Sequence, residues 1–444
     1  MKPIDQHTEV RASGPHLGPP PTTASAIGVV HVGLAKYQVV MNLARVRPVS
    51  TEVGCGYPAA GTMPPAMYLQ QILAVARNTF FESVRQPVTL VVILAATLLL
   101  ILSNPLSAFT MDDDQRMLID IGLATVFLAG AVLAAFIATS VLGREISNRT
   151  ALTVVSKPIG RPTFLLGKFI GATVALLLAI VILALVFMLV EMHTVLQTVR
   201  DPMHVPVIIF SGSAAIIAVL VAVWCNYFYG TVFTSMVIFT GAPLLVVAYL
   251  LTLNFSADFS AQDMAISFKP NLWLAMIAIL ASVMMLSAIA VAVSTRLGQV
   301  MTLLVTTGLF VLGLLSDWIF GRPLHAIEAD WIARAAEAGK VEQVEVATVV
   351  ERMSGETQTL TDTIDVAIVP LADFATGSEL VIWWLLKAGY SILPNFQVLW
   401  LSDAVTQDIA IPTSYLLQST IYGVIYTAAA LAAGVLLFQR RDLG

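Results

Sequence analysis

The sequence has few charged side chains. Its 444 residues include 23 Lys and Arg and 28 Asp and Glu. Charged residues make up 11% of the chain, whereas soluble domains carry about 25%. Hydrophobic residues make up 58%. Because so few charges cannot cover a soluble protein of this length, and because disorder requires low hydrophobicity, the composition favours a membrane protein.

Cysteines and nucleotide-binding motifs are also scarce. The chain has two cysteines, Cys55 and Cys225, so no disulfide framework is expected. The net charge of −5 gives no support for binding to nucleic acid. A phosphate-binding loop needs Gly-Lys followed by Ser or Thr, and that triplet does not occur. We therefore do not expect this chain to hydrolyse ATP by itself.

The charge-free stretches define the expected membrane spans. Seven mostly apolar stretches contain no Asp, Glu, Lys or Arg: 86–111, 121–143, 169–190, 202–257, 270–295, 297–316 and 409–439. Stretch 202–257 can hold two spans, split at 226–230. Because a spanning helix needs about 20 apolar residues, the sequence predicts an all-α polytopic membrane protein with about eight transmembrane helices.

Basic residues predict the orientation. The loop 143–168 carries Arg144, Arg149, Lys157, Arg161 and Lys168. Arg440 and Arg441 follow the last span. Because basic loops stay on the cytoplasmic side, we expect both termini to be cytoplasmic. The predicted location is a membrane that the chain crosses several times.

The two ends of the amino-terminal region differ in composition. Residues 1–66 are rich in Pro and Gly and are predicted to form a disordered tail. We also weigh a native translation start at Met63 or Met67. Residues 67–87 predict an amphipathic helix in the membrane interface, from which Arg77 and Arg85 can reach lipid phosphates. The alternative is a cytosolic extension of the first span.

The rest of the chain, from residue 88 onwards, is divided into three expected regions. Residues 88–320 are expected to contain transmembrane helices one to seven. Residues 321–412 are expected to form a small α+β extracytoplasmic cap, with a helix at 326–338 and strands at 341–350 and 359–369. Within it, 379–401 is interpreted as interfacial or re-entrant helices, and the alternative is a ninth span. Residues 413–444 hold the last span and a basic tail.

Candidate residues for chemistry are few. No ionisable residue lies in the middle of an expected span, which argues against a proton-coupled carrier. Glu191, His193, Asp201 and His204 are possible zinc ligands by type, but their spacing fits no standard pattern. No metal site, catalytic motif or enzyme activity is therefore predicted.

The loop 143–168 is the strongest candidate for a binding surface. Residues 145–153 can form two helical turns, and Pro158 with Gly160 would end that helix. Pro162 suits the first turn of the next span. A short helix framed by positive charge favours a docking surface. The alternative is that the charges only anchor the loop on the inner side.

This loop resembles the first cytoplasmic loop of ABC-2 type transporter permeases. In that family a coupling helix follows a stretch with Glu and Arg, and Pro-x-x-Arg and Leu-Leu-Gly-Lys segments come next. The matching segments here are Arg144-Glu145, Ser156-Lys157-Pro158-Ile159-Gly160-Arg161 and Leu165-Leu166-Gly167-Lys168. Segments 393–396 and 437–443 and the helix 67–87, similar to the family's elbow helix, extend the resemblance over about 67–444. The family commonly has six spans, so the hairpin 205–253 is typical of a divergent branch.

The resemblance implies the permease subunit of an ATP-driven exporter, a multi-pass protein of the bacterial cell (inner) membrane. Such a subunit dimerises with a second permease, as a homo- or heterodimer, and binds a separate ATPase subunit that holds ATP and Mg²⁺. No cofactor is expected in this chain. The resemblance assigns coupling to Arg144, Glu145, Arg149, Lys157, Pro158, Arg161, Gly167 and Lys168. The alternatives are a non-ABC channel or secondary carrier, and a non-transporting structural or regulatory membrane subunit.

Overall fold

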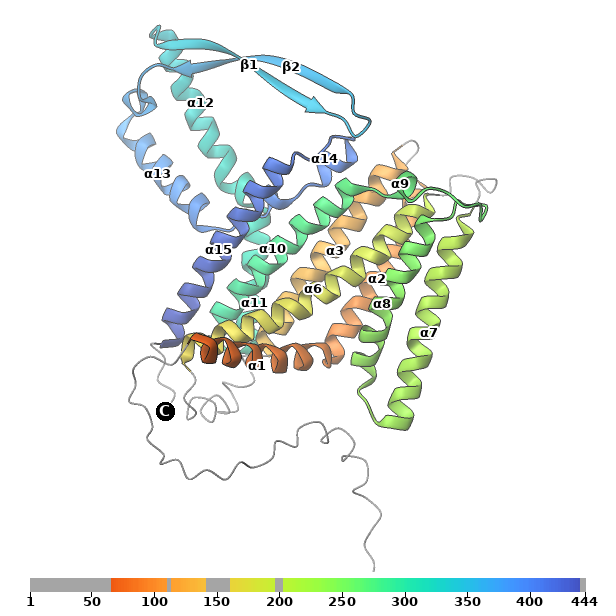
Figure 1. Cartoon of the computed structure of the whole chain (residues 1–444). Helices are drawn as coiled ribbons and strands as arrows, with labels where there is room; N and C mark the ends of the chain where they lie inside the picture. The colour runs from red at the N-terminus through yellow and green to blue at the C-terminus, as the bar shows by residue number, and fades with distance from the viewer. Residues whose placement is uncertain (1–64, 110–112, 141–159, 196–202, 440–444) are drawn as a thin grey trace, which may run out of the picture. The chain divides into compact units, whose positions relative to one another are not determined.

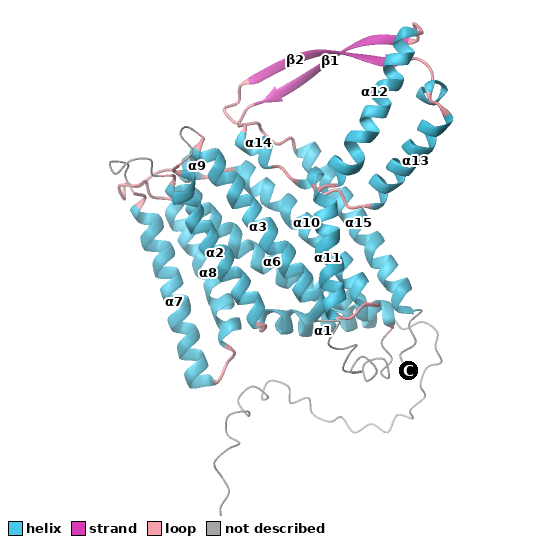
Figure 2. Cartoon of the chain, turned by 180° about the vertical axis from the view of Figure 1, so that it is seen from behind, coloured by secondary structure: helices cyan, strands magenta, loops and turns pink. Residues whose placement is uncertain are grey.

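The computed structural model describes residues 65–109, 113–140, 160–195 and 203–439. Figure 1 shows a bundle of long helices with a smaller region, which contains the two labelled strands, at one end. The view from behind in Figure 2 shows the same division between helices and strands. Nearly all of the expected tail 1–66 lies outside the described residues.

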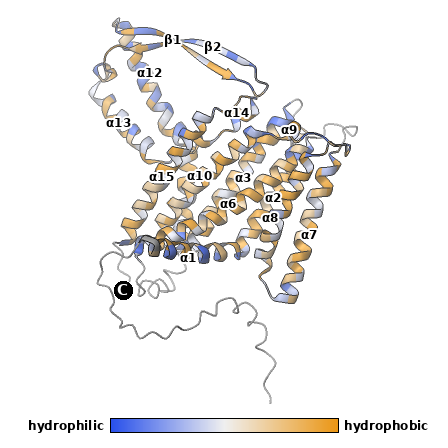
Figure 3. Ribbon diagram, viewed as in Figure 1, coloured by the Kyte–Doolittle hydropathy of each residue, from blue (hydrophilic) through white to orange (hydrophobic). Residues whose placement is uncertain are grey.

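Seven helices in the described ranges are long and apolar enough to cross a membrane. They are α2 (Pro87–Ser107), α3 (Asp114–Ala138), α6 (Arg161–His193), α7 (Val205–Tyr229), α8 (Phe233–Leu253), α10 (Pro270–Ser294) and α15 (Thr413–Gln439). Their apolar character is visible in Figure 3. The prediction of an all-α multi-pass membrane protein is confirmed as far as the number, length and apolar character of these helices show it.

The expected seventh span, 297–316, corresponds to a short helix that is followed by a bend. Helix α11 (Gln299–Leu314) has 16 residues, and at 1.5 Å per residue it reaches about 24 Å, short of the roughly 30 Å hydrocarbon layer. A π-helical segment, η2 (Asp317–Gly321), and α12 (Arg322–Glu337) follow. The axis bends by 53° between α11 and the η2–α12 segment. Counting this bent pair as one span gives up to eight candidate spans.

One end of the bundle is closed by helix α1 (Pro65–Val84), which lies across the ends of the spans (Figure 1). The start of α6 and the end of α15 meet at the same end, because Arg161 donates hydrogen bonds to the last carbonyls of α15. We call this end the α1 face. The first and last described helices therefore share one face, and the cytoplasmic orientation of that face stays a prediction.

The core lies around α3, α6 and α10, which are largely buried, while α7 and α15 are mostly exposed. An aromatic cluster ties α3 to later parts of the chain. The Phe127 ring lies 5.2 Å from Phe310, 6.0 Å from Phe396 and 5.8 Å from Trp400, between ring centroids. Phe396 is fully buried. The chain after the cap is thus anchored into the membrane bundle.

The region between α11 and α15 is a small α+β cap. Strands β1 (Val341–Glu351) and β2 (Thr357–Ala367) pair antiparallel, so both expected strands are confirmed. The expected helix 326–338 corresponds to α12, which begins at Arg322. Helix α13 (Gly377–Ile392) packs beside α12 through Trp331 and Trp383. Because α13 has only 16 residues, it is not among the candidate spans of the described chain.

A charged contact holds the two cap helices together. Arg334 on α12 donates to both carboxylate oxygens of Glu379 on α13, at 2.8 and 2.9 Å. Trp331 and the Thr376 backbone also donate to this carboxylate. The Arg334 hydrogen bonds, followed by the Thr376 amide, lower the pKa of Glu379 from 4.5 to about 2. A carboxylate with a depressed pKa stabilises the folded cap above pH 4.5.

This depressed pKa predicts a pH-dependent effect of Glu379→Gln. Amide exchange in α13 should be faster in the variant than in the native protein at pH 7. The difference should shrink as the pH falls from 4.5 towards about 2, because Glu379 itself becomes protonated over that range. Hydrogen exchange of 377–392 at matched pH values measures it. A difference of constant size from pH 7 to pH 2 would contradict the assignment.

Candidate functional site

The α1 face contains the described part of the expected docking surface. Helix α1 approaches α6 closely at Gly167 and Gly171. A Cβ on Gly167 would lie 2.7 Å from the Val75 Cβ, and a Cβ on Gly171 would lie 2.3 Å from the Ala76 carbonyl oxygen. Glycines four residues apart share one helix side and allow backbones to meet. Gly167 therefore has a packing role, whatever else binds at this face.

Lys168 forms a buried ion pair across the same contact. Its Nζ lies 3.8 Å from Oε2 of Glu82 on α1, and the lysine side chain is 2% exposed while the glutamate is 35% exposed. The Nζ also lies 5.6 Å from the centroid of the Phe164 ring. A buried charge needs such partners, because its desolvation is costly. Lys168 is thus an internal residue of the α1–α6 contact.

Arg161 connects the start of α6 to the end of α15. Its guanidinium donates to the carbonyl oxygens of Gln439 at 2.7 Å and Phe438 at 3.3 Å. It also lies over the Phe438 ring, 5.9 Å from the centroid. The last carbonyls of a helix lack partners inside the helix, and a cation there also complements the helix dipole. Arg161 therefore caps α15.

The remaining residues of the expected coupling site are Arg144, Glu145, Arg149, Lys157 and Pro158, and they lie outside the described residues. The described chain stops at Ser140 and resumes at Gly160. Gln86 at the start of α2 donates to the Ser140 hydroxyl at 2.7 Å. The residues on either side of the loop are thus hydrogen-bonded to other span ends at the α1 face. Ser140 is bonded to Gln86 at the start of α2, and Arg161 is bonded to Gln439 at the end of α15.

The apolar residues of α1 lie in two environments. Ala76 and Val84 are buried against the bundle, whereas Leu69 and Leu73 are exposed. The bundle side also holds buried polar residues, because Thr79 lies where Gly171 leaves room. Exposed leucines on a helix across the span ends suit the membrane interface.

The two arginines expected to contact lipid are exposed, Arg77 on α1 and Arg85 directly after its end. Arg77 and Arg85 lie 5.8 and 5.9 Å from the centroid of the Phe81 ring. Phe81 in turn contacts Phe239 of α8, with ring centroids 6.0 Å apart. The arginines are therefore oriented by an aromatic contact with the bundle, and their binding to lipid phosphates stays a prediction.

A second ion pair lies at the opposite end of the spans. Glu191 at the end of α6 is 1% exposed and pairs with Lys269, which precedes α10. Gln115 of α3 donates to the same carboxylate at 2.8 Å. In the described part of the chain, no group of three or more His, Cys, Asp or Glu could hold a metal ion. Asp201 lies outside that part.

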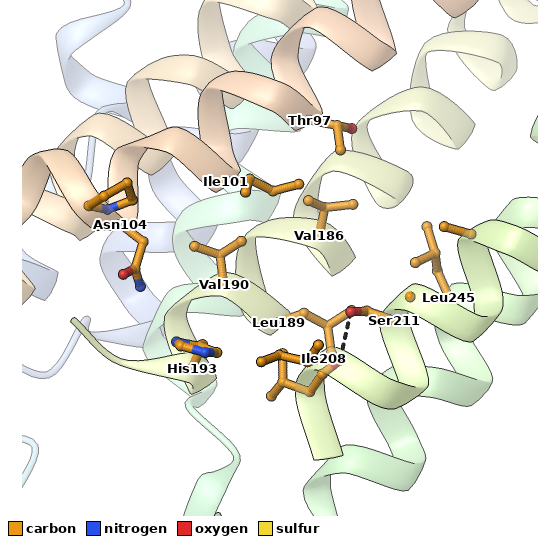
Figure 4. Close-up of a pocket in the computed structure, with 14 residues that line it drawn as sticks. Thr97, Ile101, Asn104, Val186, Leu189, Val190, His193, Ile208, Ser211 and Leu245 are labelled. Carbon is orange, nitrogen blue, oxygen red and sulfur yellow. Dashed lines mark hydrogen bonds between the residues drawn. The ribbon is translucent and has the colours of Figure 1, made fainter. Parts of the chain in front are cut away.

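An apolar cavity of about 460 Å³ lies between α2, α6, α7 and α8. Figure 4 shows its lining, with Asn104 and His193 towards one end and Leu245 towards the other. Val186 and Leu189 of α6 form a buried wall. This cavity could not be predicted, because apolar residues on spans look the same in a sequence whether they face a cavity or lipid.

Comparisons with known proteins add no relative. No family model matches the sequence, and no curated protein matches it.

Among the residues of the α1–α6 contact that were not predicted, Gly171 had a visible signal in its spacing from Gly167. Glu82 had none as the partner of Lys168, because a sequence does not show which distant charges meet.

Proposed function

We propose that this protein is the permease subunit of an ATP-driven exporter in the bacterial inner membrane. A separate ATPase subunit would bind at the α1 face through the loop 143–168, and a second permease would complete the path. One observation carries the proposal. Both attachment points of the loop are tied to several span ends, through Gln86 and Ser140 on one side and Arg161 on the other.

These ties supply a physical route for coupling. A force on the loop would act on α2 and α3 at Ser140 and on α6 and α15 at Arg161. Because α1 is packed on α6 at Gly167 and Gly171, it would move with α6. Coupling needs such contiguous contacts between packed elements. ATP and Mg²⁺ would be held by the ATPase subunit, and this chain would provide docking and the membrane path.

The internal contacts of the expected docking residues decide which variants can test the docking role. Arg161 and Lys168 have partners inside the chain, so charge reversal there would disturb folding as well as docking. Glu145→Lys combined with Arg149→Glu reverses two charges within the loop. Loss of close interfacial charge pairs costs about 2–5 kcal/mol of binding free energy. The amount of ATPase subunit that co-purifies should therefore fall about tenfold or more.

The measurement is co-purification of the tagged full chain from native membranes. The native protein should retain a subunit that carries a phosphate-binding loop, and the double variant should lose it while its amount in the membrane is unchanged. The control is Glu342→Lys with Arg352→Glu, a charge reversal in the cap. Absence of an ATPase subunit from the native preparation, or its full retention by the loop variant, would refute the proposal.

A further inference from the structure

The cavity between α2, α6, α7 and α8 is a groove with a buried wall and exposed edges. Val186 and Leu189 of α6 form the wall, and both are almost fully buried. Ile101 of α2 and Ile208 of α7 form the edges and are 54% and 48% exposed. The groove thus has a floor of side chains buried in the bundle, and its edges are side chains exposed on the outer surface of the spans.

The groove lies in one half of the membrane thickness. Its lining comes from the last turns of α2 and α6 and from the first turns of α7. Those helix ends are on the side of the spans opposite the α1 face. Asn104 and His193, which are close to the helix ends, lie at the outer end of the groove (Figure 4).

Polar atoms gather at this outer end. Asn104 donates from Nδ2 to the Thr194 carbonyl at 2.7 Å, which joins α2 to the end of α6. His204 is close enough to His193 for their charges to interact, and burial together with His193 lowers the pKa of His204. The His204 Nδ1 is buried without a hydrogen-bond partner among the described residues. The groove therefore has an apolar body and a polar end.

We propose that this groove binds one acyl chain of a membrane phospholipid, from the leaflet on the cap side. The groove opens among membrane spans, where the surrounding medium consists of acyl chains. An unfilled groove forfeits dispersion contacts along its wall, and an acyl chain restores them. The ester and head group would lie at Asn104 and His193, where the helices reach the interface.

The hairpin of α7 and α8 makes the groove possible. Helix α7 buries few side chains, and its small buried residues, among them Ala214, Ala218 and Ala222, share one side. A Cβ on Gly212 would meet no atom within 4 Å, so side chains leave the groove open there. A lipid chain would fill the space between α7 and the bundle. This inference does not depend on the proposed transport function.

The test uses photolabelling of the full chain in phospholipid nanodiscs, with a phospholipid that carries a diazirine in its acyl chain. Labels should concentrate on 97–105, 186–193 and 207–215, relative to other lipid-exposed segments. Gly212→Phe should reduce labelling of 186–193 by about fivefold or more, because the ring occupies the groove. Gly308→Phe on α11, where a Cβ also meets nothing within 4 Å, should leave it unchanged.

Three results would overturn the proposal. They are equal labelling of all lipid-facing segments, labelling that Gly212→Phe does not reduce, and labelling by a diazirine fatty acid but not by the phospholipid. Thermal unfolding of both variants shows whether they fold. If Gly212→Phe does not fold, Ala215→Phe supplies the same block from the next turn of α7, where Ala215 also lines the groove.

Discussion

Replacement of Gly171 by leucine is expected to separate α1 from α6. The first added atom would lie 2.3 Å from the Ala76 carbonyl oxygen and 2.6 Å from the Thr79 Cβ. The carbonyl belongs to the α1 backbone, so it cannot turn aside as the end of a flexible side chain could. Overpacking of this kind costs about 1–3 kcal/mol or more. The whole of α1 should shift, because both contacts lie in its middle.

Two measurements check the effect of Gly171→Leu. Thermal unfolding should occur at a lower temperature than in the native protein, and amide exchange in 65–84 should become faster. Gly308→Leu is the matched control, since a Cβ there meets nothing within 4 Å and neither property should change. Unchanged exchange in α1 of the Gly171 variant would show that the close α1–α6 contact does not exist.

The ion pair of Lys168 and Glu82 predicts an asymmetric effect of removing either charge. Glu82→Gln leaves the buried ammonium without this carboxylate, whereas Lys168→Met leaves a part-exposed carboxylate that water can reach. We expect Glu82→Gln to cost about 2 kcal/mol, less than the roughly 3–5 kcal/mol of a fully buried pair, because Glu82 is 35% exposed. Lys168→Met should cost less.

A double-mutant cycle tests this asymmetry. The double variant Glu82→Gln with Lys168→Met should be more stable than Glu82→Gln alone, since it removes the buried charge. Arg116→Gln is the control, because Arg116 and Asp113 form an exposed pair at 3.4 Å whose loss should cost about 0.5 kcal/mol or less. Equal effects of the two single changes would contradict the burial of Lys168.

The spans could be predicted because apolar runs have few alternatives in a membrane. The hairpin of α7 and α8 turns at Gly230, whose φ of 65° suits glycine, inside the expected split at 226–230. Pro162 lies in the first turn of α6, as the sequence indicated, and Pro87 likewise begins α2. The β-branched runs of the cap likewise became β1 and β2.

Charge pairs could not be predicted. The charge-free stretch begins at residue 169, but α6 also includes Lys168, which is buried and paired with Glu82 from a separate helix. Glu191 was considered as a zinc ligand by residue type, but it is buried beside Lys269. In each case the partner is far away in sequence. The expected end of the seventh span at residue 316 agrees with the end of α11, but the helical continuation through η2 into α12 was not expected.

Docking at the α1 face stays a prediction, but the helix beside the loop was predicted from the sequence. Helix α1 and the place of the loop between α3 and α6 agree with the expected element order. The structure adds internal contacts for Arg161, Gly167 and Lys168, to which the resemblance assigned coupling. A residue on a surface loop and a residue that fixes two helices can carry the same charge, so only tertiary contacts distinguish them.

The bond between Arg161 and the end of α15 sets an order of events during biosynthesis. The two residues are separated by 278 positions, so at about 5–20 residues per second the ribosome needs roughly 15–60 s to pass from one to the other. The cap is synthesised within that interval, because it precedes α15 in the chain. A newly made protein can therefore form this contact of the α1 face only after the cap and α15 have been synthesised.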